Sequence, residues 1–315
     1  MKYIKYLNLL FLAMLVLATV TSCASRDEIF EREQYKTVIA ILSDDGFNIF
    51  SEELIISEEK IDGYIVASCG GVLPTTEPIE ITMVEDGNLL DEYNTSSFDT
   101  DVERYAHYLD VDRYTIENSK INIAAGERIG KMKIKLRTDG LSPDSTYFIP
   151  LKANYSSVYE LNQKKGSVLY RIFLKNYYAT TKAETWYSHR GVRNSANTMI
   201  QKRVFPISKN EVRTFAGIKT HQANEGLINQ WSVRLIVAED STVTIKPWNT
   251  TDFGMKITQL DGDEEYPNVF KVVDDGYKTY KTFLLKYEYI DPDDGKTYQM
   301  KEELRLEFNM RDESN

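Results

Sequence analysis

The sequence predicts an all-β protein, on three observations. Apolar and polar residues alternate with a period of two, strand-like runs recur about every ten residues, and turn residues stand between them. No segment shows the sustained three-four periodicity, with caps, of an amphipathic helix. Strand spacing of this kind is typical of a β-sandwich. We therefore expect a sandwich in the first half of the chain and a second β domain after it.

The first half contains clear strand signals. Residues 79–83 alternate apolar and polar side chains, and the same period recurs at 131–136, so each should be a strand with one wet face. Pro150 lies inside another apolar run, and proline has no N–H for a sheet ladder, which favours an edge position or a bulge there. The other predicted strands of this half are at 37–42, 121–123, 147–151 and 168–174.

Polar and small residues at 176–184 interrupt this pattern, so we place a boundary there between a first domain at 35–178 and a second at 179–315. Acidic, glycine-ending turns at 274–276 and 291–295 mark two hairpins. Long strands joined in this way predict an antiparallel barrel, with a lipocalin-like meander as one form, or a second sandwich. The strands expected in this half are at 204–205, 212–215, 231–237, 243–245, 269–273, 283–290 and 304–308.

The first 22 residues have the pattern of a signal peptide. Two lysines precede an apolar run at 9–20, which is shorter than the roughly 20 residues of a transmembrane helix. The segment Val-Thr-Ser-Cys at 20–23 resembles a bacterial lipobox, in which the Cys23 thiol receives diacylglycerol. Because each buried methylene of an acyl chain contributes about 0.8 kcal/mol, we expect a membrane anchor. An ordinary secretory signal with a chance cysteine is the alternative.

An acidic tether at 23–34 follows the lipobox. Its residues 24–28, Ala-Ser-Arg-Asp-Glu, resemble the surface-export signal of Bacteroidetes lipoproteins, and a plain solvated tether is the alternative. The resemblance implies a lipid-anchored protein of the outer membrane that faces the extracellular side.

Composition excludes several classes of function. The formal net charge is −10, and the 38 basic residues are scattered among 48 acidic ones, so a nucleic-acid partner is not expected. Three histidines and two cysteines leave few metal ligands, and we expect no metal or other cofactor. Cys69 ends an apolar run and should be a buried small hydrophobe. The acidic loop at 291–295 is interpreted as a hairpin, with a calcium loop as the alternative.

Motifs of enzymes are missing from the sequence. There is no Gly-rich phosphate loop, His-Glu-x-x-His, Gly-x-Ser-x-Gly or Asp-x-x-Asp-x-Asp-x-Glu. We therefore expect a protein without catalytic residues. A glycoside hydrolase with two dispersed carboxylates stays open, because such a pair leaves no local signature.

Three segments of the first half carry a family resemblance: 105–116 (Tyr-Ala-His-Tyr-Leu-Asp-Val-Asp-Arg-Tyr-Thr-Ile), 123–127 with its following strand, and 147–151. Together they resemble an N-terminal Ig-like domain of unknown function in Bacteroidetes surface lipoproteins, including some endo-β-N-acetylglucosaminidases. Residues 110–112, Asp-Val-Asp, stand where that pattern has Leu-Pro. The second half resembles the β-rich partner that often follows this domain. The resemblance implies an Ig-like β-sandwich and, through polysaccharide-utilisation loci, glycan capture beside outer-membrane transporter components.

Tryptophans, which sugar sites use as flat apolar platforms, occur only in the second half. Trp231 shares strand parity with apolar neighbours and should be core. Trp248 falls on a polar face beside the loop 249–252, so we predict either a sugar platform or packing against the other domain. Trp186, Tyr187 and Arg190 form a cluster near the domain junction that combines aromatic faces with donors, for sugar binding or for structure.

These observations predict a non-catalytic, glycan-binding surface lipoprotein, with Trp186, Tyr187, Arg190 and Trp248 as candidate sugar contacts. A structural or adhesive protein that binds protein partners is the alternative from a different class. A glycoside hydrolase is the third reading.

Overall fold

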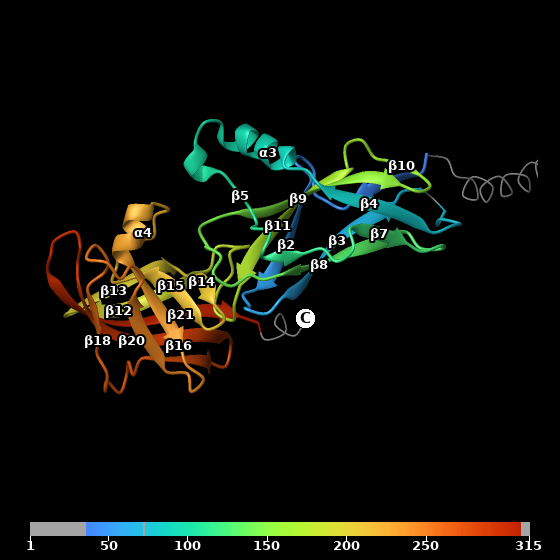
Figure 1. Cartoon of the computed structure of the whole chain (residues 1–315). Helices are drawn as coiled ribbons and strands as arrows, with labels where there is room; N and C mark the ends of the chain where they lie inside the picture. Colours follow the sequence, from blue (N-terminus) through green and yellow to red (C-terminus); the bar gives the residue numbers. More distant parts are fainter. Residues whose placement is uncertain (1–35, 72, 310–315) are drawn as a thin grey trace, which may run out of the picture.

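The computed structural model describes residues 36–71 and 73–309, and places two β-rich domains end to end (Figure 1). The predicted signal peptide, Cys23 and the acidic tether lie outside the described residues, so the lipid anchor stays a prediction. Across the described part of the chain, no helix combines the length and the apolar character needed to cross a bilayer. The predicted all-β class is confirmed by three sheets with 11, 6 and 4 strands.

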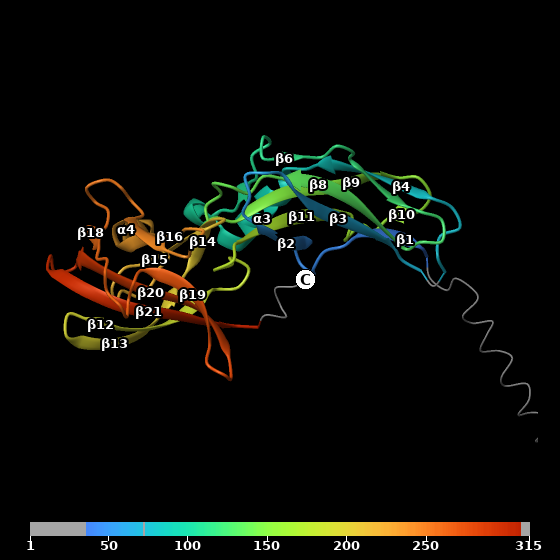
Figure 2. The ribbon, with the colours of Figure 1, turned by 90° about the horizontal axis from the view of Figure 1, so that it is seen from below.

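The first domain is built from one hydrogen-bonded sheet that folds over one main core (Figure 2), and a smaller apolar cluster around Phe148 lies apart from it. The order is β10-β1-β3-β8-β7-β4-β9-β11-β2, with β5 beside β9 and β6 beside β8. Its strands are β1 (Val38–Ile41), β2 (Ile49–Ile55), β3 (Ile61–Cys69), β4 (Ile79–Glu85), β5 (His107–Tyr108), β6 (Tyr114–Thr115), β7 (Lys120–Ile123), β8 (Ile129–Leu136), β9 (Tyr147–Ser156), β10 (Glu160–Leu161) and β11 (Ser167–Lys175).

Alternation along these strands fills the first core. In β8 the residues Met132, Ile134 and Leu136 are buried, while the lysines between them face solvent. Each buried aliphatic side chain of this size contributes about 1.5–3 kcal/mol relative to an exposed one. Cys69 is buried at the end of β3 in the same core, which confirms its prediction as a small hydrophobe.

Pro150 does not lie at an edge or a bulge, so that expectation is wrong. Its strand β9 runs inside the sheet between β4 and β11. On the β4 side, however, β5 pairs only as far as Phe148, and β4 begins to pair at Leu151. Pro150 falls in the gap between these two partners, where no ladder bond requires an N–H.

Two α-helices and one short 3-10 helix were not expected from the sequence. Helix α3 (Asn88–Phe98), followed by the short helix η1 (Val102–Arg104), connects β4 to β5. Only Leu90 and Asn94 of α3 are buried, and the Asn94 side chain bonds both backbone groups of Ala106, at 2.9 and 2.8 Å. Leu89 and Tyr93 pack half-buried beside Leu90, but the polar Asn94 interrupts this face, so the apolar pattern of α3 is too short to predict a helix.

Helix α4 (Glu225–Trp231) is only seven residues long, and its N-terminus is capped by Asn224, whose side chain accepts a hydrogen bond from the Leu227 N–H. The strand expected at 231–237 therefore begins one residue later, at Ser232. Trp231 is 2% exposed, which confirms it as core.

The second domain consists of two sheets that curl around one core to form a half-barrel. The predicted hairpins are confirmed, because Asp274 pairs with Thr279 and Ile290 with Thr297. The larger sheet has the order β13-β12-β21-β20-β18 with β19 beside β20, and the smaller sheet has the order β14-β15-β16-β17. Their strands are β12 (Trp186–Arg193), β13 (Ala196–Arg203), β14 (Phe205–Ser208), β15 (Glu211–Phe215), β16 (Ser232–Val237), β17 (Val243–Pro247), β18 (Ile257–Gln259), β19 (Val269–Asp274), β20 (Thr279–Ile290) and β21 (Thr297–Phe308).

A buried ionic cluster joins four strands of the larger sheet. The Glu302 carboxylate of β21 lies 2.6 Å from Lys202 Nζ of β13 and 3.0 Å from His189 Nδ1 of β12, and it accepts a 3.0 Å hydrogen bond from Tyr287 of β20. All four side chains are almost completely buried. Burial by itself would raise the pKa of Glu302, but the charge of Lys202 and the contact with His189 outweigh it and lower the pKa to about 2.

A second ionic contact joins the two domains. Arg213 of β15 is buried, and its guanidinium makes two hydrogen bonds of 2.6 Å to Asp144 in the β8–β9 loop of the first domain. The same guanidinium lies 4.7 Å from the ring centre of Phe205 and 5.0 Å from that of Trp248. This bidentate, aromatic-flanked arrangement is the geometry in which arginine binds a carboxylate best.

Replacing Glu302 should destabilise the second domain strongly. Glu302→Ala leaves the Lys202 ammonium buried without its counter-charge, so the free energy of unfolding should fall by about 3–5 kcal/mol in urea titrations. The matched control is Glu307→Ala on the same strand, which removes an exposed ion pair with Lys278 and should lower the free energy of unfolding far less. Equal losses in the two variants would contradict this account.

The stability of the protein should also fall as the pH drops from 6.5 towards 4. Burial, with Arg203 and Arg213 nearby, lowers the pKa of His221 from 6.5 to about 4. In this range the unfolded chain binds a proton that the folded chain does not, so acid favours unfolding. Because His221 is only half-buried, we expect the free energy of unfolding to fall by about 1–2 kcal/mol over this range. Urea midpoints measured across this range should lose that slope in His221→Gln, and an unchanged slope would refute the assignment.

Candidate functional site

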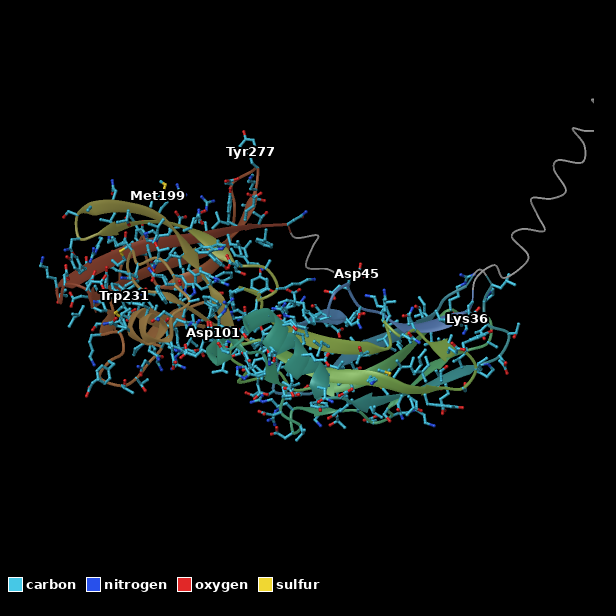
Figure 3. The ribbon with its side chains drawn as sticks, turned by 90° about the horizontal axis from the view of Figure 1, so that it is seen from above. Lys36, Asp45, Asp101, Met199, Trp231 and Tyr277 are labelled. Atoms are coloured by element: carbon cyan, nitrogen blue, oxygen red, sulfur yellow. The ribbon has the colours of Figure 1, made fainter. Side chains whose placement is uncertain are left out.

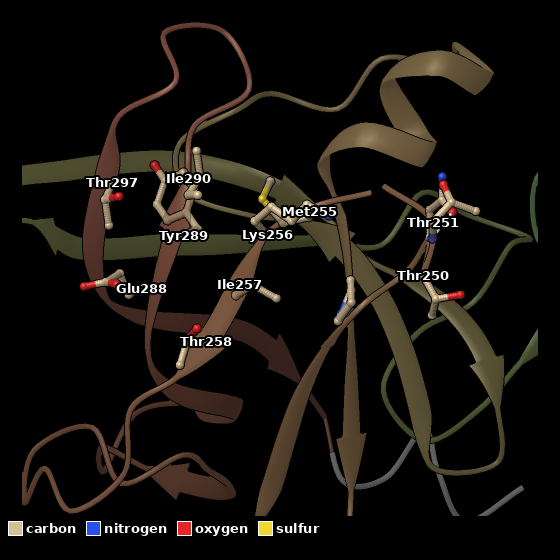
Figure 4. Close-up of a pocket in the computed structure, with 12 residues that line it drawn as sticks. Thr250, Thr251, Met255, Lys256, Ile257, Thr258, Glu288, Tyr289, Ile290 and Thr297 are labelled. Carbon is tan, nitrogen blue, oxygen red and sulfur yellow. Dashed lines mark hydrogen bonds between the residues drawn. The ribbon is translucent and has the colours of Figure 1, made fainter. Parts of the chain in front are cut away.

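A polar cavity of about 400 Å³ opens in the second domain (Figure 4). Its walls come from the loop after β17, from β18 and from the adjoining ends of β20 and β21. Such a volume lies within the range of small-ligand sites in proteins. The lining residues are Pro247, Asn249, Thr250, Thr251, Met255, Lys256, Ile257, Thr258, Glu288, Tyr289, Ile290 and Thr297.

Local backbone contacts hold the loop wall in shape. The Asn249 side chain accepts a hydrogen bond from Thr251 N at 3.0 Å, and Gly254 N donates to Thr251 O at 3.0 Å. A Cβ atom at Gly254 would stand 1.8 Å from the carbonyl oxygen of Asn249, so only glycine fits there. The turn leaves the neighbouring Phe253 with 84% of its surface exposed, in the same loop as the cavity wall.

Strand pairing holds the opposite wall. Ile257 and Thr258 of β18 pair with Tyr289 and Glu288 of β20. The Ile290 N–H extends this ladder with a 3.0 Å bond to the Lys256 carbonyl. These side chains are therefore carried by sheet backbone, which holds a ligand contact more firmly than a free loop does.

The lining groups are mostly uncharged hydrogen-bonding groups. They include four threonine hydroxyls and an asparagine amide, with one cation, Lys256, and one anion, Glu288. Among the described residues that line the cavity, Glu288 is the only carboxylate, whereas both glycosidase mechanisms require two. The arrangement suits a neutral ligand rich in hydroxyl groups.

Trp248 does not face this cavity, although its neighbours Pro247 and Asn249 line it. Side chains alternate in extended backbone, so Trp248 lies on the other side, half-buried against the core. Its ring covers Arg213, the residue that binds Asp144 of the first domain. The sequence left two roles open for Trp248, a sugar platform or packing against the other domain. The structure shows its ring in contact with the inter-domain ion pair.

The other predicted sugar contacts lie on β12 and are not brought together with Trp248. Tyr187 is 0% exposed, packs against Phe283 and donates to the Tyr178 carbonyl, so its prediction as a sugar contact is wrong. Trp186 is half-buried and donates to Glu184 at 2.9 Å. Arg190 is exposed and lies 3.3 Å from Glu303. The expected cluster divides because successive strand residues point to opposite faces.

Sequence reasoning missed Lys256 and Glu288 of the cavity lining, and Phe253, which is exposed in the same loop. The sequence indicated the polar loop at 249–252. Phe253 directly after it lies in no predicted strand, so side-chain alternation did not predict its exposure. An aromatic residue between aspartate and glycine in a polar loop is the pattern that could have identified it.

No cluster of three or more metal-ligating side chains occurs in the part of the chain that the structure describes. The acidic loop considered for calcium forms the β20–β21 hairpin turn: Asp291 N donates to Lys296 O and Gly295 N to Asp291 O, both at 2.8 Å. The Asp291 carboxylate is bound by Arg193.

Comparison with solved structures shows the same fold in two Bacteroides ovatus proteins. A Bacteroides ovatus protein of unknown function has a TM-score of 0.62 at 12% identity, covering 86% of this chain and 94% of its own. A Bacteroides ovatus multidomain protein that includes DUF1735 has a TM-score of 0.59 at 12% identity, with 87% and 95% covered. An auxiliary nutrient binding protein from Bacteroides thetaiotaomicron has a TM-score of 0.49 at 15% identity, with 82% and 90% covered. No curated protein matches the sequence.

Family models cover most of the chain. A model of an N-terminal domain matches residues 35–160, and a model of a C-terminal domain matches residues 166–305. The chain therefore belongs to a family of two-domain, all-β Bacteroidetes proteins composed of this N-terminal and this C-terminal domain.

Proposed function

We propose that this protein is a non-catalytic surface lipoprotein that binds a neutral glycan in the cavity between the loop 249–256 and strands β18 and β20. The observation that carries the proposal is the combination of hydroxyl-lined walls with an exposed aromatic ring, Phe253, in the wall loop. Sugars present hydroxyl groups at their rims and apolar C–H faces to aromatic rings, so both parts of a pyranose have a counterpart here.

The charges of the cavity also support a neutral ligand. Lys256 and Glu288 balance each other, and Asp252 lies 3.8 Å from the Lys256 ammonium. The whole chain has a net charge of −10, which disfavours a polyanion. Capture without turnover follows from the single carboxylate among the lining residues.

The proposed location combines the Cys23 anchor with outer-membrane export. A diacylglycerol-modified cysteine followed by an acidic tether would hold both domains at the cell surface, where a polysaccharide is first met. Components of an outer-membrane transporter are the protein partners that this role would require.

Removing the exposed ring should weaken glycan binding. Loss of one stacked aromatic face removes about 1–2 kcal/mol, so Phe253→Ala should lower the affinity for a bound polysaccharide about five- to thirtyfold. Calorimetry and affinity electrophoresis against plant and host polysaccharides provide the measurement.

The matched control for Phe253→Ala is Tyr277→Ala. Tyr277 is 96% exposed at the tip of the β19–β20 hairpin, at the far end of β20 from the cavity (Figure 3). Its removal should leave the affinity unchanged. Silence of the wild-type protein across the whole panel, or equal losses in both variants, would refute the proposed function.

Replacement of the predicted lipidated residue tests the location. Cys23→Ala removes the thiol that accepts diacylglycerol, so the protein should move from the membrane fraction to the soluble fraction. Protease treatment of intact cells should degrade the anchored wild-type protein if it faces outward. A variant that stays in the membrane fraction would contradict the anchor, and protection from protease would contradict surface exposure.

A further inference from the structure

A second groove, of about 360 Å³, lies on the outer face of the larger sheet of the second domain. It spans four neighbouring strands in the order β13, β12, β21 and β20. None of the residues used above for the cavity contributes to it. Its lining includes Ser188, Arg190, Met199, Gln201, Tyr280 and Arg305.

The groove combines apolar surface with planar donors. The Arg305 guanidinium lies 3.8 Å from the centre of the Tyr280 ring, and Met199 beside them is 77% exposed (Figure 3). The Nε atom of Arg305 is covered by protein and makes no hydrogen bond among the described residues, with the Glu303 carboxylate as its neighbour at 3.8 Å.

Acidic neighbours neutralise the two arginines of the groove. Glu303 lies 3.3 Å from Arg190 and 3.8 Å from Arg305, and Asp275 lies 3.7 Å from Arg305. Arginines balanced in this way offer N–H groups to hydroxyls without attracting a polyanion. The groove therefore has the same chemical preference as the cavity, a neutral ligand with hydroxyl groups and apolar faces.

Each site has side chains on the outer face of the β20–β21 pair, although Tyr289 of the core face also lines the cavity. Odd-numbered residues of β20 from Phe283 to Tyr289 fill the core, so Tyr280 in the groove and Glu288 in the cavity both belong to the outer face. Arg305 and Thr297 of β21 share a parity in the same way. Eight residues separate each pair, which at about 3.4 Å per residue is roughly 27 Å along the strands.

The stretch between the two sites is held by an ion-pair bridge. The Asp263 carboxylate lies 2.9 Å from Lys286 of β20 and 2.7 Å from Lys301 of β21. With regular strand pairing from Thr279 to Ile290, this keeps the spacing of the two sites constant. A rigid spacing gives the second contact of a matching polymer a high effective concentration.

We propose that the groove is a second glycan-binding subsite, and that one neutral polysaccharide chain occupies the groove and the cavity together. This inference rests on the proposed function of the cavity. Occupation of both sites by one chain makes the second contact intramolecular, so a polymer that spans them binds more tightly than a fragment of the same glycan that reaches only one site.

Two groove variants test the second subsite. Tyr280→Ala removes the ring under Arg305, and Met199→Glu places a charge at a position so exposed that folding should be unaffected. In calorimetry, the wild-type protein should bind two short oligosaccharides per chain, and each groove variant only one. The affinity for the polysaccharide should exceed that for the oligosaccharide by at least about tenfold in the wild type and lose this advantage in both variants. Tyr277→Ala, three residues from Tyr280, is the matched control and should behave as the wild type.

The outcomes separate the two proposals. One oligosaccharide per wild-type chain, with polysaccharide affinity that Tyr280→Ala and Met199→Glu leave unchanged while Phe253→Ala still weakens it, would overturn the second subsite and keep the cavity. Loss of binding in the groove variants with no effect of Phe253→Ala would overturn the cavity as a site. Absence of binding to any glycan would overturn both.

Discussion

The Glu302 carboxylate is the interaction on which the second domain depends. It meets an ammonium, an imidazole and a phenol from three neighbouring strands in a space closed to water, where an unpaired charge would be costly. The contact fixes β12, β13, β20 and β21 relative to one another, and these strands carry the groove and one wall of the cavity. A set of apolar side chains would pack there as well, but it would specify the strand register less strictly.

The domain junction shows how one polar contact redirects an aromatic residue. Arg213 loses its hydration where it binds Asp144, and the rings of Phe205 and Trp248 lie over its guanidinium. Trp248 therefore packs at the domain junction. The loop that follows it is held by Asn249 and Gly254 and exposes a different ring, that of Phe253, to solvent. The lining of the polar cavity therefore includes threonine hydroxyls but not Trp248.

Prediction from sequence succeeded where a side chain's environment follows from local alternation. The strands around Met83 and Leu136, the two acidic hairpins and the burial of Cys69 and Trp231 are all of this kind. It failed where a distant partner decides the outcome. Pro150 is tolerated inside a sheet because two other strands stop on either side of it, and α3 is held by a polar anchor, Asn94, that resembles a loop residue in sequence.

The sequence by itself determined the all-β class, most strand positions and the core faces, because alternation and turn chemistry act between residues that are neighbours in the chain. Only the tertiary structure decided which polar side chains converge. Lys202 and Glu302 are about one hundred residues apart in the chain, as are the groove residues of β12–β13 and β20–β21. Because pairing of distant strands brings them together, no local pattern marks the buried charge cluster, and the sequence indicated only single segments of the two candidate binding sites.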